Sequence, residues 1–167
     1  MKEAMVNALN AQVNAEFYSS YFYLGMESYF QSLSLNGFAA WMRAQVQEEM
    51  FHGMKMYDYI HERGGKAVLE AIERPEQTWA SPLACFEQVL AHEQKVTALI
   101  NNLMDVAIEN RDHAGKFFLD WFVGEQVEEE STVGAVVDKL RLIGDNSSAL
   151  FLLDAELAKR IFTPPVK

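Results

Sequence analysis

The sequence predicts an all-α protein: a four-helix bundle with one long crossover connection and a short fifth helix near the C-terminus. Three observations support this class. Apolar residues recur every three or four positions along almost the whole chain, and the alternation typical of strands is nearly absent. Signals for helix ends are few and widely spaced. One connection between the expected helices is much longer than the others.

Glycine, proline and capping residues divide the chain into five expected helices. The expected breaks lie at 36–37, 64–65, 112–113 and 144–146. Ser81 followed by Pro82 is typical of an N-cap and a first-turn proline, so a helix should begin there. The expected helices span 4–34, 38–63, 82–110, 114–143 and 147–159.

The lengths of the connections constrain the topology. The first and second helices, and likewise the third and fourth, are joined by short segments and should form antiparallel hairpins. The connection between the second and third helices, about 18 residues, could extend over about 60 Å at about 3.3 Å per residue. A helix of about 26 residues is only about 39 Å long. The connection can therefore run the full length of a bundle, and we expect one domain over residues 1–167.

Composition and charge exclude some classes of protein. Half of the 167 residues are hydrophobic and 23% are charged, which is ordinary for a globular protein and argues against disorder. The net charge is −10, from 24 acidic and 14 basic residues. Because nucleic-acid binding needs a basic surface, we expect no nucleic-acid partner. An acidic protein attracts cations instead.

The single cysteine and the N-terminal residues favour a cytoplasmic protein. Cys85 lies among apolar residues and is interpreted as a small core side chain, with no intrachain disulfide possible. The first residues include Asn7, Asn10 and Gln12 rather than the apolar region of a signal peptide. No apolar run is long enough to cross a bilayer, so no membrane partner is expected.

Polar residues interrupt the buried stripe of each long helix near its middle. In an up-and-down bundle, mid-helix positions meet at one level, so these residues should converge. They are Glu16, Glu49, His52, Glu93, Gln126 and Glu129. Burying four unpaired carboxylates together would be very costly, whereas a pair of divalent cations would neutralise all four.

The side chains at this level indicate which metal would bind. Carboxylates with one imidazole suit iron or manganese better than thiolate-seeking metals, although zinc could compete. Glu49 and His52 are three residues apart and share a helix face, so both could reach one ion. The spacing alone is weak, because Asp58 and His61 repeat it without a partner set. A metal-free bundle with structural carboxylates is the alternative.

A second acidic set flanks these core positions. It consists of Glu48, Glu125, Glu128 and Glu130. Such runs are often a solvated face. We favour instead a third metal position formed by Glu48, Glu125 and Glu128, which would share Glu129.

Tyr23 lies two helical turns after Glu16 on the same face. It could donate a hydrogen bond to a ligand or supply an electron, or it could simply be a core tyrosine. Trp121 is more consistent with packing. The other histidines have no converging acidic set and are interpreted as non-ligands: His61, His92 and His113.

Several segments together resemble the non-haem ferritins of bacteria and archaea. The likeness is carried by Glu-Glu-Met-x-His at 48–52, His-Glu at 92–93, and Glu-Gln-x-Glu-Glu-Glu at 125–130. It extends to Asn-Ala-Glu at 14–16, Asn-Gly-Phe at 36–38 and the short fifth helix, and so covers essentially the whole chain.

This resemblance implies a ferroxidase centre with three metal positions. The first would use Glu16, Glu49 and His52, with Gln126 near it. The second would use Glu49, Glu93 and Glu129, with Glu49 bridging. The third would use Glu48, Glu125, Glu128 and Glu129. Tyr23 matches the family's nearby tyrosine.

The resemblance also implies a partner set and an assembly. Members oxidise Fe(II) with O2 or H2O2 and store ferric mineral inside a hollow cage, a 24-mer of identical chains. Bacterioferritins differ by a second Glu-x-x-His in the fourth helix, where this chain has Gln-Val-Glu-Glu at 126–129. They bind haem through a methionine that Met50 matches, but non-haem members often carry the same residue, so no haem is expected.

The sequence therefore predicts an iron-storage protein with ferroxidase activity. One alternative is a di-iron oxidase or peroxidase of the rubrerythrin type, which would need a Cys-x-x-Cys electron-transfer domain that a chain with one cysteine lacks. The other is a metal-free interaction bundle.

Overall fold

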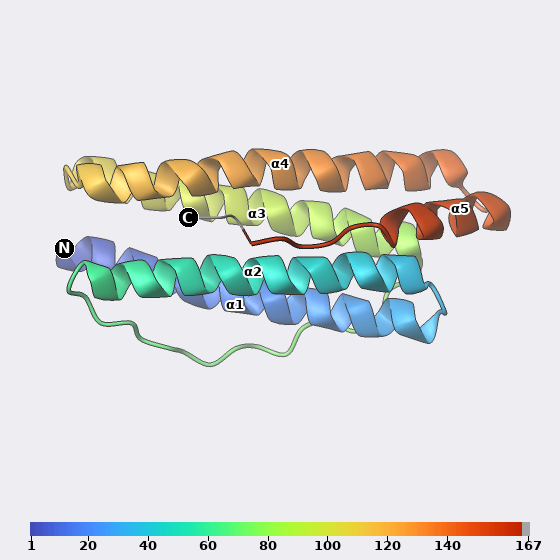
Figure 1. Cartoon of the computed structure of the whole chain (residues 1–167), viewed down its shortest axis with the longest axis horizontal. Helices are drawn as coiled ribbons and strands as arrows, with labels where there is room; N and C mark the ends of the chain where they lie inside the picture. Colours follow the sequence, from blue (N-terminus) through green and yellow to red (C-terminus); the bar gives the residue numbers. More distant parts are fainter. Residues whose placement is uncertain (165–167) are drawn as a thin grey trace.

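The computed structural model describes residues 1–164 and confirms the predicted all-α bundle (Figure 1). Its helices are α1 (Glu3–Ser32), α2 (Asn36–Glu62), α3 (Pro82–Glu109), α4 (His113–Ile143) and α5 (Ser147–Leu157). Each end lies within two residues of the predicted one. No helix in residues 1–164 is long and apolar enough to cross a membrane.

The crossover connection runs as the sequence predicts. Residues 63–81 leave the end of α2 and return along the α1–α2 hairpin to the far end of the bundle, where α3 begins (Figure 1). Two asparagines of α1 fasten this segment. The Asn10 side chain donates to Lys66 O at 3.0 Å and accepts from Val68 N at 2.7 Å, and Asn14 Oδ1 accepts from Glu70 N at 3.0 Å.

The helix start expected from Ser81 and Pro82 is confirmed, and two further helices begin with side-chain caps that were not predicted. The side-chain oxygens of Ser81, Asp112 and Asn146 each accept a hydrogen bond from the backbone N–H three residues later, at 3.1, 3.0 and 3.1 Å. These bonds satisfy donors that a helix N-terminus otherwise leaves free. Such caps are local in sequence, which is why the one at Ser81 could be recognised before the structure.

The break between the first two helices lies at 33–35 rather than at the predicted 36–37, because Asn36 and Gly37 lie in the first turn of α2. The Asp154 carboxylate of α5 accepts hydrogen bonds from the backbone N–H groups of Gly37 and Phe38 at 2.8 and 3.0 Å. A Cβ atom on Gly37 would lie 1.7 Å from the backbone oxygen of Asp154. Gly37 therefore allows α5 to pack closely against α2, and it does not end a helix.

Two apolar clusters fill the bundle and leave a polar layer between them. One cluster lies toward α5 and includes Phe30, Phe38 and Phe86; the other lies toward the N-terminus and includes Leu9 and Ile100. Cys85 is buried in the first cluster, and burial raises the pKa of its thiol, so the predicted core role is confirmed.

The backbones of α2 and α4 are farther apart than those of the packed hairpins, but their side chains meet. Gln45 Nε2 of α2 donates to Glu129 Oε2 of α4 at 3.0 Å, and the Tyr59 and Phe118 rings stack with centroids 3.8 Å apart. Within the described residues, no Cα atom of α2 comes within 8 Å of a Cα atom of α4, whereas α1 and α3 do approach that closely. The segment that follows α5, residues 158–164, lies along this side between α2 and α4 (Figure 1). The C-terminal segment thus covers the α2–α4 side of the bundle from outside.

Candidate metal centre

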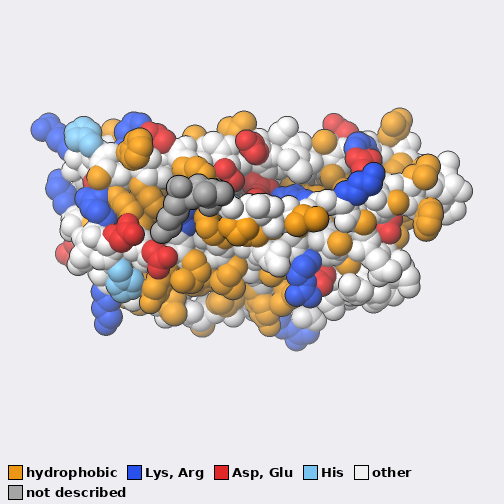
Figure 2. Space-filling model, viewed as in Figure 1, with side chains coloured by type: hydrophobic (Ala, Val, Ile, Leu, Met, Phe, Trp, Pro, Cys, Tyr) orange, Lys and Arg blue, Asp and Glu red, His pale blue; other side chains and the backbone are white. Residues whose placement is uncertain are grey.

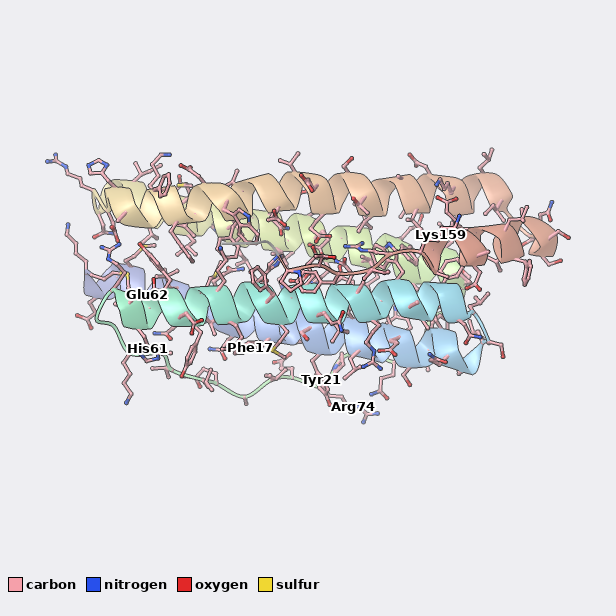
Figure 3. The ribbon with its side chains drawn as sticks, viewed as in Figure 1. Phe17, Tyr21, His61, Glu62, Arg74 and Lys159 are labelled. Atoms are coloured by element: carbon pink, nitrogen blue, oxygen red, sulfur yellow. The ribbon has the colours of Figure 1, made fainter. Side chains whose placement is uncertain are left out.

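The polar residues predicted at one level are all buried in the middle of the bundle. Their exposed fractions are Glu16 1%, Glu49 2%, His52 2%, Glu93 1%, Gln126 5% and Glu129 4%. All four long helices contribute, and Figure 3 shows side chains from these helices reaching into the space between the two hairpins. With almost no access to water, these side chains must satisfy each other's charge or bind a cation.

Glu16, Glu49 and His52 form a compact set of donors. Each offers one ligand atom, and the three atoms lie within 4.8 Å of one another. His52 Nδ1 is 3.4 Å from Glu49 Oε2, as the three-residue spacing on α2 allows. Glu16 Oε1 accepts a hydrogen bond from Gln12 Nε2 at 2.8 Å, whereas Glu16 Oε2 is buried without a partner in residues 1–164. This donor set fits a hard or borderline divalent cation.

Neutral donors orient the other two carboxylates. The Tyr23 hydroxyl donates to Glu93 Oε1, and Gln126 Nε2 donates to Glu93 Oε2 at 3.2 Å. Gln45 Nε2 donates to Glu129 Oε2 at 3.0 Å. Here Gln126 acts as a hydrogen-bond donor to a candidate ligand.

Electrostatics within this layer favour protons or cations. Burial raises the pKa of Glu49 well above its usual value, and the charges of Glu93, Glu16 and Glu129 raise it further. Burial likewise raises the pKa of Glu93 to about 7 and that of Glu129 to about 8. Without a cation, the four carboxylates cannot all be charged at neutral pH.

The imidazole is suited to bind metal. Burial lowers the pKa of His52, which keeps the ring neutral and its nitrogen lone pair available. The Trp121 ring packs edge-on against it, with the centroids 5.4 Å apart. Trp121 therefore packs against a candidate ligand, in line with its interpretation from sequence.

The flanking acids form a second group, but with a composition different from the predicted one. Ligand atoms of Glu48, His52 and Glu125 lie within 4.8 Å of one another. Burial, with the nearby charges of Glu128 and Glu48, raises the pKa of Glu125. Within residues 1–164, neither Glu128, which is exposed, nor Glu129 joins this group. The predicted four-glutamate third position stays a prediction.

The remaining histidines lie outside both groups. His92 is half-buried and hydrogen-bonded to Ser19 Oγ at 2.8 Å, and burial lowers the pKa of its ring to about 4. His61 and His113 are exposed. Among the described residues, none of the three belongs to a group of potential metal ligands.

Several polar partners of these ligands were not predicted from the sequence. Gln12 precedes Glu16 by one helical turn, and Gln45 lies on the buried stripe of α2, so spacing could have indicated both. Arg160, whose Nη2 atom is 2.7 Å from Glu48 Oε2, lies just beyond the last predicted helix. No periodic pattern there could have indicated its contact.

Comparisons with known proteins agree with this geometry. The family described as "Ferritin-like domain" matches residues 6–143. The chain is 43% identical to a bacterial non-heme ferritin from Bacteroides fragilis over 160 residues, covering 96% of this chain and 99% of the relative. It is also 43% identical to one from Staphylococcus saprophyticus over 162 residues, covering 97% of each chain.

Solved structures show the same similarity. An engineered closed form of the Archaeoglobus fulgidus ferritin superimposes with a TM-score of 0.96 at 53% identity, covering 98% of this chain and 99% of that one. The open-pore ferritin of the same archaeon superimposes with a TM-score of 0.95 at 52% identity, covering 96% and 98% of the two chains.

Proposed function

Since this chain belongs to the ferritin family, we propose that it stores iron and oxidises Fe(II) at the buried carboxylate layer. The observation that carries this is the set formed by Glu16, Glu49 and His52, which is almost fully buried and has a carboxylate oxygen without a partner in residues 1–164. An unpartnered oxygen in such a place is costly for the apo protein and becomes favourable when a cation binds.

Two Fe(II) ions would be the substrate. One would bind to Glu16, Glu49 and His52, and the other to Glu49, Glu93 and Glu129, with Glu49 between them. The mutual influence of these carboxylates on the pKa of Glu49 supports their closeness. Binding would displace the protons that the apo carboxyl groups hold near neutral pH.

The protein side chains would favour oxidation of the bound iron. Carboxylates are hard, anionic donors and stabilise Fe(III) over Fe(II). Tyr23 and Gln126 would hold Glu93, and Gln45 would hold Glu129, in the orientation needed by the ion. O2 or H2O2 would accept the electrons. Water bound to the ferric product is acidified, which promotes hydrolysis to mineral.

The oxidised iron would leave through the flanking acids. The group formed by Glu48, His52 and Glu125 shares His52 with the first set and is less buried, so it lies between the buried layer and the surface. We retain the third position proposed from sequence, with Glu128 and Glu129 completing it once iron is present.

Storage requires a closed assembly, and we propose a homo-oligomeric cage of the family's 24-mer type. An apolar groove of about 470 Å³ on the α1–α2 side supports a further protein contact there; its lining includes Phe17, Tyr21 and Met50. Figure 3 labels Phe17 and Tyr21 on this side, beside the crossover connection. Met50 lines this groove, and the absence of haem stays a prediction.

The rubrerythrin-type alternative is not favoured. The relatives are ferritins over nearly their whole length, and the one cysteine is buried in the apolar core. A metal-free bundle would leave the partly protonated carboxylate layer without a role.

Native mass measurement before and after Fe(II) loading in air tests the storage function. We expect a large assembly that gains far more iron than two ions per chain. A small species that stops at two ions per chain would support the enzyme alternative, and a species that takes up no iron would support the metal-free bundle.

A further inference from the structure

The C-terminal segment places a positive charge beside the flanking acids. After α5, the chain turns back along the outside of the bundle between α2 and α4 (Figure 1). Lys159, labelled in Figure 3, marks the start of this return. Figure 2 shows acidic and basic side chains close together along the same line.

Arg160 is held there by two different contacts. Its Nη2 atom donates to Glu48 Oε2 at 2.7 Å, and its guanidinium carbon lies 4.4 Å from the centre of the Trp41 ring. Two residues later, the Phe162 ring lies 5.9 Å from the Phe51 ring, which anchors the segment to α2. The arginine therefore occupies a defined position.

The same carboxylate belongs to the flanking metal group. Glu48 offers a ligand atom to the set that contains His52 and Glu125. The side chains of Arg160 and Glu48 are 21% and 18% exposed, so solvent screens their attraction less than it does for a fully exposed pair. A guanidinium is always charged and cannot ligate a metal. A cation that binds Glu48 must therefore compete with Arg160.

We propose that Arg160 is an internal competitor that sets the metal affinity of the group formed by Glu48, His52 and Glu125. This inference rests on the proposed function, because it assigns a regulator to the route by which iron leaves the buried layer. With the guanidinium on Glu48, a metal ion binds this group only weakly and passes on. Without it, the ion stays.

A metal ion can displace the guanidinium of Arg160 from Glu48, because few contacts hold it. Within residues 1–164, the other terminal nitrogen of Arg160, Nη1, is buried without a hydrogen-bond partner, so one hydrogen bond and one stacking contact hold the guanidinium. A divalent ion carries twice the charge and accepts several oxygen ligands at once. It can thus release the arginine while Phe162 keeps the segment in place.

The test is calorimetric titration of the assembled apo protein with Mn²⁺ in the absence of O2. The Glu125→Gln variant removes one ligand of the flanking group, so the binding step that it weakens belongs to that group. Arg160→Gln should tighten that step by about tenfold, the effect of about 1.4 kcal/mol. The step at the buried layer should change less, because Arg160 contacts Glu48 directly, whereas it acts on Glu129 only through its charge. Arg160→Lys, which keeps the charge, should give a smaller change.

A matched control is Arg141→Gln, which removes an arginine that is 2.9 Å from a carboxylate, Glu87, on the exposed surface. It should leave both steps unchanged. If Arg160→Gln does not assemble, Phe162→Ala loosens the same segment without removing a charge, and it should tighten the flanking step in the same direction.

Three results would overturn the inference. An unchanged flanking step in Arg160→Gln would make the arginine only an anchor for the segment. A weaker step would mean that Arg160 positions Glu48 for metal. If wild-type protein binds no Mn²⁺ at the buried layer, the proposed function fails, and the inference fails with it.

Discussion

Glu27 and Glu49 show why burial alone does not make a glutamate a ligand. Both are buried and lie on core-facing stripes, but Glu27 Oε1 is 2.6 Å from Arg43 Nη2, whereas Glu49 is surrounded by other carboxylates. An arginine neutralises the charge of the first, although Glu27 Oε2 is buried without a partner in residues 1–164, and only a proton or a metal can neutralise the second. The difference lies in the neighbours that each helix brings, and the sequence showed it through four helices that agree on one level.

The raised pKa values predict an unusual pH dependence for the apo protein. Free glutamates lose their protons near pH 4.3, whereas Glu93 and Glu129 in the folded protein hold theirs to about pH 7 and 8. The folded state thus binds more protons in this window, so the free energy of unfolding should fall by several kcal/mol as pH rises from about 4.5 to 8, since one pKa unit corresponds to about 1.4 kcal/mol. Urea unfolding of metal-free protein at pH 5 and pH 8 measures it.

Added Mn²⁺ should reverse this trend, because metal binds the deprotonated carboxylates and its affinity rises with pH. If the free energy of unfolding of the metal-free protein increased from pH 5 to pH 8, that result would contradict a buried layer of carboxyl groups that hold protons near neutral pH.

Tyr23→Phe tests the orientation of Glu93. The change removes the hydroxyl that donates to Glu93 Oε1 and leaves the ring in place. We expect a loss of about 1 kcal/mol in stability and oxidation of Fe(II) slowed several-fold, with the number of Mn²⁺ ions bound per chain unchanged. Denaturant unfolding and stopped-flow absorbance measure the two effects. An oxidation rate equal to that of the wild type would show that Tyr23 is only a core residue.

At the scale of elements, features set by neighbouring residues could be predicted from the sequence, whereas features set by contacts between distant residues could not. Ser81 with Pro82 marked a helix start because the cap bonds its own helix. Gly37 was misread because its reason lies 117 residues away, in the close approach of Asp154. Arg160 was missed because its contact with Glu48 spans 112 residues and follows no helical period.

The contact between α5 and α2 gives a paired prediction. Gly37→Ala should push α5 off α2, because the new Cβ would lie 1.7 Å from the backbone oxygen of Asp154, and should cost several kcal/mol. Gly124→Ala is the control: it is also a glycine inside a helix, but a Cβ there meets nothing within 4 Å, so it should be neutral or stabilise by up to about 1 kcal/mol. Thermal unfolding compares them, and equal effects would contradict the role of Gly37.

At the scale of the whole molecule, the bundle holds its candidate ligands buried in its middle. The helices pack most closely where α1 meets α2 and α3 meets α4, and the space between α2 and α4 is covered by the C-terminal segment. The sequence predicted the bundle, the level of the carboxylates and the crossover, because each follows from helical spacing or length. It could not predict the wider spacing between the backbones of α2 and α4 in residues 1–164, which depends on how far apart two packed helices lie. The single domain over 1–167 and the cytoplasmic location stay predictions.

The most direct test of the central claim is stopped-flow oxidation of two Fe(II) ions per chain by O2. The wild type should show a fast phase, and the Glu49→Gln, His52→Ala double variant should lose it, with oxidation slowed at least about 100-fold, because the shared ligand and the imidazole are both gone. Glu27→Gln, a buried glutamate on α1 that pairs with Arg43, should keep the fast phase. A double variant that oxidises iron at the wild-type rate would contradict the account.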